Sequence, residues 1–157
     1  MKTIITTATL IVTLLLTGCK SGESISKQEN IAQITKKIES GDYKFIPQKA
    51  IPMGASPVNL SYTFSLKVSK DSIDSYLPYY GRAYIAPSPT DGGIKFVSTD
   101  FNYTISEKKK GMWDISIIPN DNQKRYRLSL NVGETGYGTL TVQDTNRQSI
   151  SFYGVIE

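Results

Sequence analysis

The clearest pattern along the chain is a strict alternation of apolar and polar residues in its second half. Five runs show the alternation: residues 101–105, 113–117, 126–132, 140–142 and 150–152. In each run every second side chain is apolar, so one face of the segment can be buried while the other stays in water. This period of two predicts antiparallel β-sheet.

Turn sequences separate these runs and continue the same organisation toward the N-terminus. They are Ser69-Lys70-Asp71, Asp91-Gly92-Gly93, Lys110-Gly111, Asn120-Asp121-Asn122, Gly133-Glu134-Thr135-Gly136 and Asp144-Thr145-Asn146. Gly, Asn and Asp favour tight turns, and a spacing of about ten to twelve residues favours an up-and-down meander. We therefore expect a mainly β fold after Gly41, an antiparallel meander curled into a sandwich or a partly closed barrel.

A helical period precedes the strands. Ile31, Ile34 and Ile38 recur at spacings of three and four, which places them on one face of a helix. Ser26 and Glu29 have the spacing of a capping box, and Gly41 is a typical C-terminal stop. The sequence predicts one N-terminal amphipathic helix over about residues 27–40, packed on the β domain through its isoleucines.

The first eighteen residues have the form of an export signal. Lys2 precedes an apolar run from Ile4 to Leu16, and the small residues Thr17 and Gly18 follow. The run is shorter than the roughly 20 residues that a membrane-spanning helix needs. An ordinary secretory signal and an unusual membrane helix are the alternatives to the interpretation that Cys19 suggests.

Leu16-Thr17-Gly18-Cys19 resembles the lipobox of bacterial lipoproteins, in which the chain is cut before a cysteine that carries lipid. Cys19 is the only cysteine of the chain, and the residues after it are polar. We expect residues 1–18 to be a lipoprotein signal peptide, Cys19 to be the lipid (palmitate) attachment site, residues 19–27 to be a polar tether, and residues 28–157 to be a single mostly β domain. Each buried CH₂ contributes about 0.8 kcal/mol, so two or three acyl chains anchor a protein almost irreversibly.

This interpretation makes the membrane a partner of the protein, through the lipid anchor on Cys19, and places the protein in the bacterial cell envelope. Lys20 after the cysteine provides no obvious signal for retention in the inner membrane, so we expect the outer membrane. The net charge of +4 is spread along the chain. The dense run Lys108-Lys109-Lys110 fits a solvated turn between strands, and we expect no nucleic-acid partner.

Composition excludes several chemistries. The chain has no histidine, so it has neither a Ser/His/Asp nor a Cys/His catalytic site, nor an imidazole metal site. A single cysteine excludes an intrachain disulfide and thiolate zinc sites. We expect no catalytic residue, no cofactor and no metal.

Weaker motifs have simpler explanations. Ser24 to Lys27 and Ser106 to Lys109 match Ser-x-x-Lys, but neither predicted location is dry enough to lower the pKa of a lysine. The Gly133-x-x-Gly136-x-Gly138 segment lies between strands, where glycines serve a turn and a bulge rather than a phosphate loop. The aspartates are scattered, and a glycosidase would need two carboxylates roughly 5–9 Å apart.

The segment LPYYGRAYIAP, from Leu77 to Pro87, concentrates tyrosines around one arginine. One interpretation is that the segment forms a structural corner. Proline and glycine would shape the bend, and the tyrosines would suit a half-buried position beside an arginine. As a functional site it would be a groove for a glycan, peptide or other partner, lined by Tyr79, Tyr80, Arg82 and Tyr84. The structural interpretation is favoured because it accounts for each residue type without a ligand.

Several motifs, in order, resemble the domain of unknown function 4251 family of Bacteroides-type secreted proteins and lipoproteins. They are Ile38-Glu39-Ser40-Gly41 leading into Tyr43-Lys44-Phe45, Pro52-Met53-Gly54, Leu77–Tyr84, Gly92-Gly93-Ile94-Lys95-Phe96 and Arg147–Gly154. The resemblance covers about residues 30–157 and implies an envelope location and a mostly β domain. It implies no activity.

We therefore predict a non-enzymatic envelope lipoprotein that binds or scaffolds an unknown protein or glycan partner. One alternative is a carrier that holds an apolar or glycan ligand inside its curled sheet, which requires an apolar cavity. The other is a carboxylate-based hydrolase, which requires two acids facing each other across a cleft.

Overall fold

The computed structural model describes residues 21–85, 92–123 and 125–157. The predicted signal peptide, Cys19 and Lys20 lie outside the described residues, as do Asp91 and Pro87. The chain divides into two units, Met1–Asn30 and Ile31–Glu157. The described part of the first unit is the beginning of helix α2, and all of the strands belong to the second. None of the helices in the described residues has both the length and the apolar character that a membrane crossing needs.

Helix α2 runs from Ser21 to Ser40 and so begins earlier than the predicted start near residue 27. Ser26 and Glu29 lie inside the helix, so their capping-box spacing does not mark its beginning. The expected tether is helical from Ser21 onward. The physical reason is that adding residues to an existing helix costs little once its nucleus has formed, and no proline interrupts residues 21–27.

The C-terminal end of α2 is where the sequence predicts it. Gly41 has a φ of 65°, its amide donates to the Ile38 carbonyl oxygen at 3.2 Å, and the Asp42 amide donates to the Lys37 carbonyl oxygen at 3.2 Å. These two bonds satisfy carbonyls that the end of a helix leaves free. Ile34 and Ile38 are buried in the core of the second unit, which confirms the predicted apolar face.

All strands in the described residues belong to one antiparallel sheet. They are β1 (Tyr43–Pro52), β2 (Val58–Asn59), β3 (Ser65–Val68), β4 (Ile73–Leu77), β5 (Ile94–Ser98), β6 (Phe101–Lys109), β7 (Met112–Pro119), β8 (Tyr126–Gly133), β9 (Tyr137–Asp144) and β10 (Arg147–Ile156). The strand order is β5-β4-β3-β1-β10-β9-β8-β7-β6, with the short β2 paired to β1.

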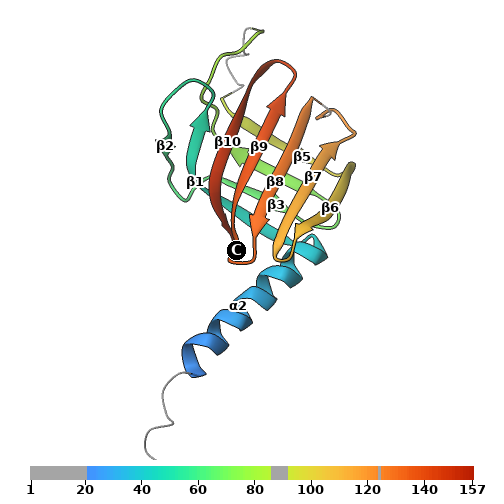
Figure 1. Ribbon diagram of the computed structural model, residues 1–157. Coiled ribbons are helices and arrows are strands. Elements are labelled where there is room, and N and C mark those ends of the chain that lie inside the picture. The colour runs from blue at the N-terminus through green and yellow to red at the C-terminus, as the bar shows by residue number, and fades with distance from the viewer. Residues whose placement is uncertain (1–20, 86–91, 124) are drawn as a thin grey trace, which may run out of the picture. The chain divides into compact units, whose positions relative to one another are not determined.

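The order contains two meanders joined by the first and last long strands. Neighbours in sequence pair from β3 to β5 and from β6 to β10, while the β1–β10 pairing connects the halves. The sheet curls so that β3, β4 and β5 cross behind β6 to β10 (Figure 1). Strands β5 and β6 are its two edges, so the sheet is a half-barrel. The predicted fold class is confirmed.

Strand β1 bends to take part in both layers. Its beginning pairs with β3 through Tyr43 to Phe45, and the register with β10 shifts between Pro47 and Lys49. Proline cannot donate to a sheet ladder, so a bulge is a position at which a strand accommodates it. Pro47 therefore sits where the strand bends.

The space between the layers is filled by side chains from both. Tyr126, Phe45 and Phe152 are among the largest fully buried residues, and Trp113 joins the same cluster. The pockets described below open to solvent rather than into this cluster. The carrier alternative requires an apolar cavity, and a filled core of this kind counts against it.

Candidate functional site at the Tyr79 corner

The tyrosine-rich segment begins where β4 ends. Leu77 is the last residue of β4 and is fully buried, and Pro78 after it is buried as well. Gly81 has a φ of 152°, and a Cβ placed there would lie 2.8 Å from the Tyr79 hydroxyl oxygen. Only a residue without a side chain lets Tyr79 fold back over the bend. The predicted role of Gly81 in a tight bend is confirmed.

Backbone hydrogen bonds tie this segment to the beginning of β10. The Tyr84 amide donates to the Asn146 carbonyl oxygen at 2.8 Å, and the Gln148 amide donates to the Arg82 carbonyl oxygen at 3.0 Å. Ala83 forms an isolated antiparallel bridge with Arg147. The corner is therefore held by a strand that lies more than sixty residues away in sequence.

The Tyr79 side chain completes this attachment. Its hydroxyl bonds to the carbonyl oxygens of Arg82, at 2.9 Å, and Gln148, at 3.0 Å. Burial raises the pKa of the Tyr79 hydroxyl, and the positive charge of Arg147 opposes that rise. Tyr79 thus links the bend to β10 through its hydroxyl group.

The arginine that lies over the Tyr79 ring is Arg147, whereas the sequence suggested Arg82. The Arg147 guanidinium carbon is 5.0 Å from the ring centroid, and only 5% of the residue is exposed. Its Nη1 donates to the Gly93 carbonyl oxygen at 3.0 Å, and its Nε lies 3.7 Å from Oδ2 of the buried Asp144. One buried cation therefore connects the beginning of β10 with the residue before β5.

A pocket of about 470 Å³ opens beside this corner. Its aromatic lining includes a stacked pair, Phe64 and Tyr76, with ring centroids 5.8 Å apart, and the Lys95 ammonium lies 4.7 Å from the Tyr76 ring centroid. The full lining is Phe64, Tyr76, Pro78, Tyr79, Tyr80, Gly81, Ala83, Gly92, Gly93, Lys95 and Arg147.

Two of the four predicted groove residues, Tyr79 and Tyr80, line this pocket. Arg82 and Tyr84 are exposed and are not among its lining residues. The sequence reasoning missed Tyr76 and Lys95, although strand alternation places them opposite each other on β4 and β5. It also missed Arg147, which lies in a motif quoted for the family resemblance.

The residues that line the pocket include no carboxylate. Two other pockets, described below, are lined by one carboxylate each, Glu134 in one and Asp114 in the other. None of the three therefore contains the pair of facing acids that a glycosidase uses. Among the described residues, acids and cysteine form no cluster able to hold a metal ion. What the corner offers is a set of exposed aromatic faces beside one lysine.

The sequence profile of the family described as "Domain of unknown function (DUF4251)" matches residues 26–156. The chain belongs to the DUF4251 family. The resemblance found in the sequence motifs is thereby confirmed. None of the proteins with curated descriptions matches the DUF4251 chain significantly in sequence.

A solved structure has a fold similar to that of this DUF4251 chain. It is the crystal structure, at 1.95 Å resolution, of a DUF4251 family protein from Bacteroides eggerthii DSM 20697. The TM-score is 0.63 at 12% sequence identity, and the alignment covers 81% of this chain and 86% of that one. At this identity the likeness concerns the fold alone.

Proposed function

We propose that this DUF4251 protein is a non-enzymatic binding module, held at the envelope by lipid on Cys19, whose Tyr79 pocket receives an extended segment of a partner protein. One observation carries the proposal. The aromatic pocket opens at the beginning of β5, a strand at the edge of the sheet.

An edge strand favours a peptide over other partners. Within the described residues β5 pairs with β4 alone, so its other side can accept an additional strand. Gly92 and Gly93 precede β5 and Lys95 lies in it, and all three line the pocket. A strand added along β5 would therefore carry its side chains past the aromatic rings. Lys95 would supply one positive charge to an acidic residue.

The corner is built in a way that lowers the cost of binding. Tyr79 and Arg147 fix the wall of the pocket through hydrogen bonds to backbone carbonyls. Binding therefore costs little additional conformational entropy at this wall. Tyr76 and Tyr80 are 42% and 37% exposed, which leaves their faces available for contact. Rigid aromatic surface of this kind dominates binding energy at many interfaces.

The lipid anchor is supported by the sequence of residues 16–19 and by the single cysteine. Cys19→Ala should abolish incorporation of labelled palmitate and leave the precursor uncut, because lipoprotein processing needs the modified sulfur. Gel analysis of labelled cells tests this. If the variant stayed labelled and membrane-bound, the anchor would lie elsewhere.

The pocket is tested by a photo-crosslinking side chain placed at Tyr80, with the same group placed at Tyr62 as the control. Tyr62 is 80% exposed and does not line the pocket. We expect one discrete protein adduct at position 80, none at position 62, and loss of the adduct when Tyr76→Ala is added. Purified partner should then bind with weakened affinity to Tyr76→Ala. A glycan adduct at position 80, or equal adducts at both positions, would contradict the proposal.

A further inference from the structure

A second hollow lies on the outer face of the sheet, at the end where β8 turns into β9. The strand register pairs Gly133 with Met112 of β7, and on the other side Gly133 lies next to the Val132–Gly138 pair of β8 and β9, beside Tyr137. Because Gly133 has no side chain, its position is a gap between two exposed neighbours, which are 42% and 48% exposed. The resulting pocket has a volume of about 400 Å³.

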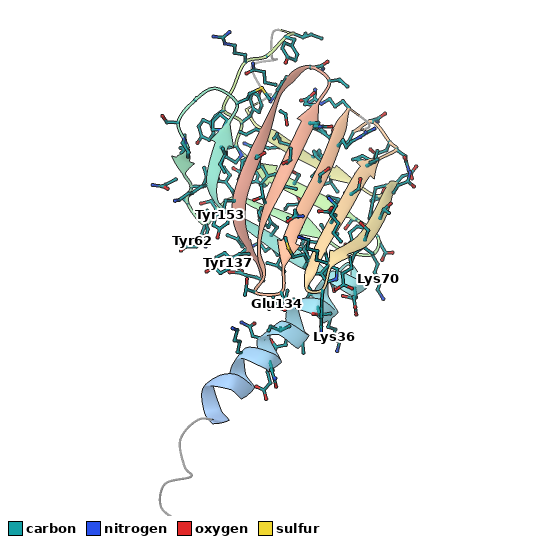
Figure 2. All side chains as sticks on the ribbon, viewed as in Figure 1. Lys36, Tyr62, Lys70, Glu134, Tyr137 and Tyr153 are labelled. Carbon is teal, nitrogen blue, oxygen red and sulfur yellow. The ribbon has the colours of Figure 1, made fainter. Side chains whose placement is uncertain are left out.

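One wall of this hollow is a pair of tyrosines. Tyr137 and Tyr153 stack with ring centroids 6.0 Å apart and ring planes within 13° of each other. Tyr153 is 39% exposed, and both rings line the pocket. Figure 2 shows them, with Glu134, at the same end of the sheet. Two exposed parallel rings at the rim of a hollow form an aromatic platform.

Polar groups surround the platform without a strong excess of charge. Asn131 and Thr139 form the side of the pocket away from the turn, and Lys110 and Glu134 lie at its turn end. Besides the tyrosines, the lining therefore offers an amide, two threonine hydroxyls, one cation and one anion. Such a mixture suits a neutral ligand that carries many hydroxyl groups and apolar C–H faces.

A continuous polar row leads away from the platform across five strands. The register aligns Ser106, Asp114, Asn131, Thr139 and Tyr153 as neighbours from β6 to β10. An adjoining pocket of about 370 Å³ shares Asn131 and Thr139 with the first and is lined largely by Ser and Thr side chains. With about 4.8 Å between strands, the row is roughly 19 Å long. That is the length of a short oligomer rather than of a single small molecule.

We infer that this face is a binding site for a neutral oligosaccharide, seated with one sugar ring against Tyr137 and Tyr153 above Gly133. Aromatic rings pack against the C–H face of a sugar, while amide, hydroxyl and charged side chains bond to its hydroxyl groups. The site is separate from the Tyr79 pocket, because the two linings share no residue.

The test fills the hollow without disturbing the fold. A Cβ at Gly133 would meet only the Tyr137 carbonyl oxygen, at an ordinary contact distance of 3.8 Å, and its φ is not positive. Gly133→Val therefore adds side-chain volume where the sugar ring would sit, and valine is favourable in a strand. The variant should keep or raise the melting temperature, so a loss of binding cannot be attributed to unfolding.

The full-length protein is purified in a detergent without a sugar head group and titrated with maltotetraose, cellotetraose, mannotetraose and chitotetraose. We expect at least one to bind, and Gly133→Val and Tyr153→Ala each to weaken that binding by roughly tenfold or more. Tyr62→Ala, at an exposed tyrosine outside the pocket, should bind as the unmodified protein does.

Two results would overturn the inference. One is no binding of any of the four sugars at about 10 mM, the weakest affinity that would still be measurable. The other is binding that Gly133→Val leaves unchanged. Gly133→Val should also leave the crosslink from position 80 intact, so failure here is distinguishable from failure of the proposed peptide site.

Discussion

The guanidinium of Arg147 lies over the ring of Tyr79, 5.0 Å from its centroid, and each side chain also bonds to a backbone carbonyl of another segment. Arg147 reaches Gly93 and Tyr79 reaches Gln148, so together they join the end of β4, the beginning of β5 and the beginning of β10. These strands are not neighbours in the sheet, except β4 with β5. The pair therefore fastens the two layers at one end.

Arg147→Ala should destabilise the protein strongly. It removes the bond to Gly93 and the cation over Tyr79, and it takes a positive charge away from the buried carboxylate of Asp144. Breaking a buried ion pair by removing one partner costs about 3–5 kcal/mol of the free energy of unfolding. Urea unfolding measures this change.

Arg82→Ala is the matched control, because Arg82 is exposed and its backbone makes its hydrogen bonds to Tyr79 and Gln148. Its free energy of unfolding should change by less than about 0.5 kcal/mol. Equal effects of the two substitutions would contradict the role given to Arg147.

Tyr79→Phe should lower the free energy of unfolding by about 1 kcal/mol, the usual loss when one hydrogen bond is removed. The ring and its contact with Arg147 remain, while the single hydroxyl proton, which the carbonyl oxygens of Arg82 and Gln148 share, is lost. Tyr84→Phe, at a residue 69% exposed, serves as control and should be nearly neutral. An equal loss in the free energy of unfolding for both variants would mean that the Tyr79 hydroxyl does not stabilise the corner.

Strand positions could be predicted because burial of one sheet face imposes a period of two on the sequence. The burial of Arg147 could not be predicted in this way, for a physical reason. The register between β9 and β10 is irregular between Arg147 and Ile150, so the alternation that marks Ile150 and Phe152 does not extend to it. What makes the burial of this charge tolerable is a carbonyl at Gly93, far away in sequence. Local pattern carries no information about that contact.

The same limit applies to how the strands pair. Alternation and turn sequences predict each meander. No local sequence signal predicts the pairing of β1 with β10, which joins the two meanders across the whole length of the β domain. The helix shows a different limit. Ser26 and Glu29 have a capping-box spacing, yet the helix continues past them to Ser21, since a start signal inside a propagating helix does not stop it.

The stability of the protein should decline above about pH 10 because of buried tyrosines. Burial, and secondly the neighbouring Tyr103, raise the pKa of Tyr43 well above its ordinary value of 10.0. Above pH 10 the unfolded chain loses this proton while the folded chain keeps it. The folded state then binds more protons than the unfolded state, so the free energy of unfolding falls as the pH rises. The stabilising contribution of Tyr43 is therefore fully present only below pH 10.

Tyr43→Phe should therefore reduce this alkaline decline, by up to about 1.4 kcal/mol for each pH unit that it spans. Its hydroxyl is buried with no hydrogen-bond partner among the described residues, so at pH 8 the substitution should be neutral or stabilising. Urea unfolding at a series of pH values tests both points. An unchanged slope would show that Tyr43 ionises as easily in the folded state as in the unfolded one.

The Asp144–Arg147 pair should behave as a coupled unit. Asp144 Oδ1 accepts a bond from the Asn146 amide at 2.9 Å, and Oδ2 faces Arg147. Asp144→Asn keeps an oxygen for the first contact but leaves Arg147 without its counter-charge. It should still cost less than Arg147→Ala, which also removes the bond to Gly93 and the contact with the Tyr79 ring. Combining Asp144→Asn with Arg147→Met should cost less than the sum of the two single changes, by about 0.5–3 kcal/mol, because the double variant leaves neither charge buried alone. A double-mutant cycle in urea measures this coupling, and strict additivity would show that the two side chains do not stabilise each other.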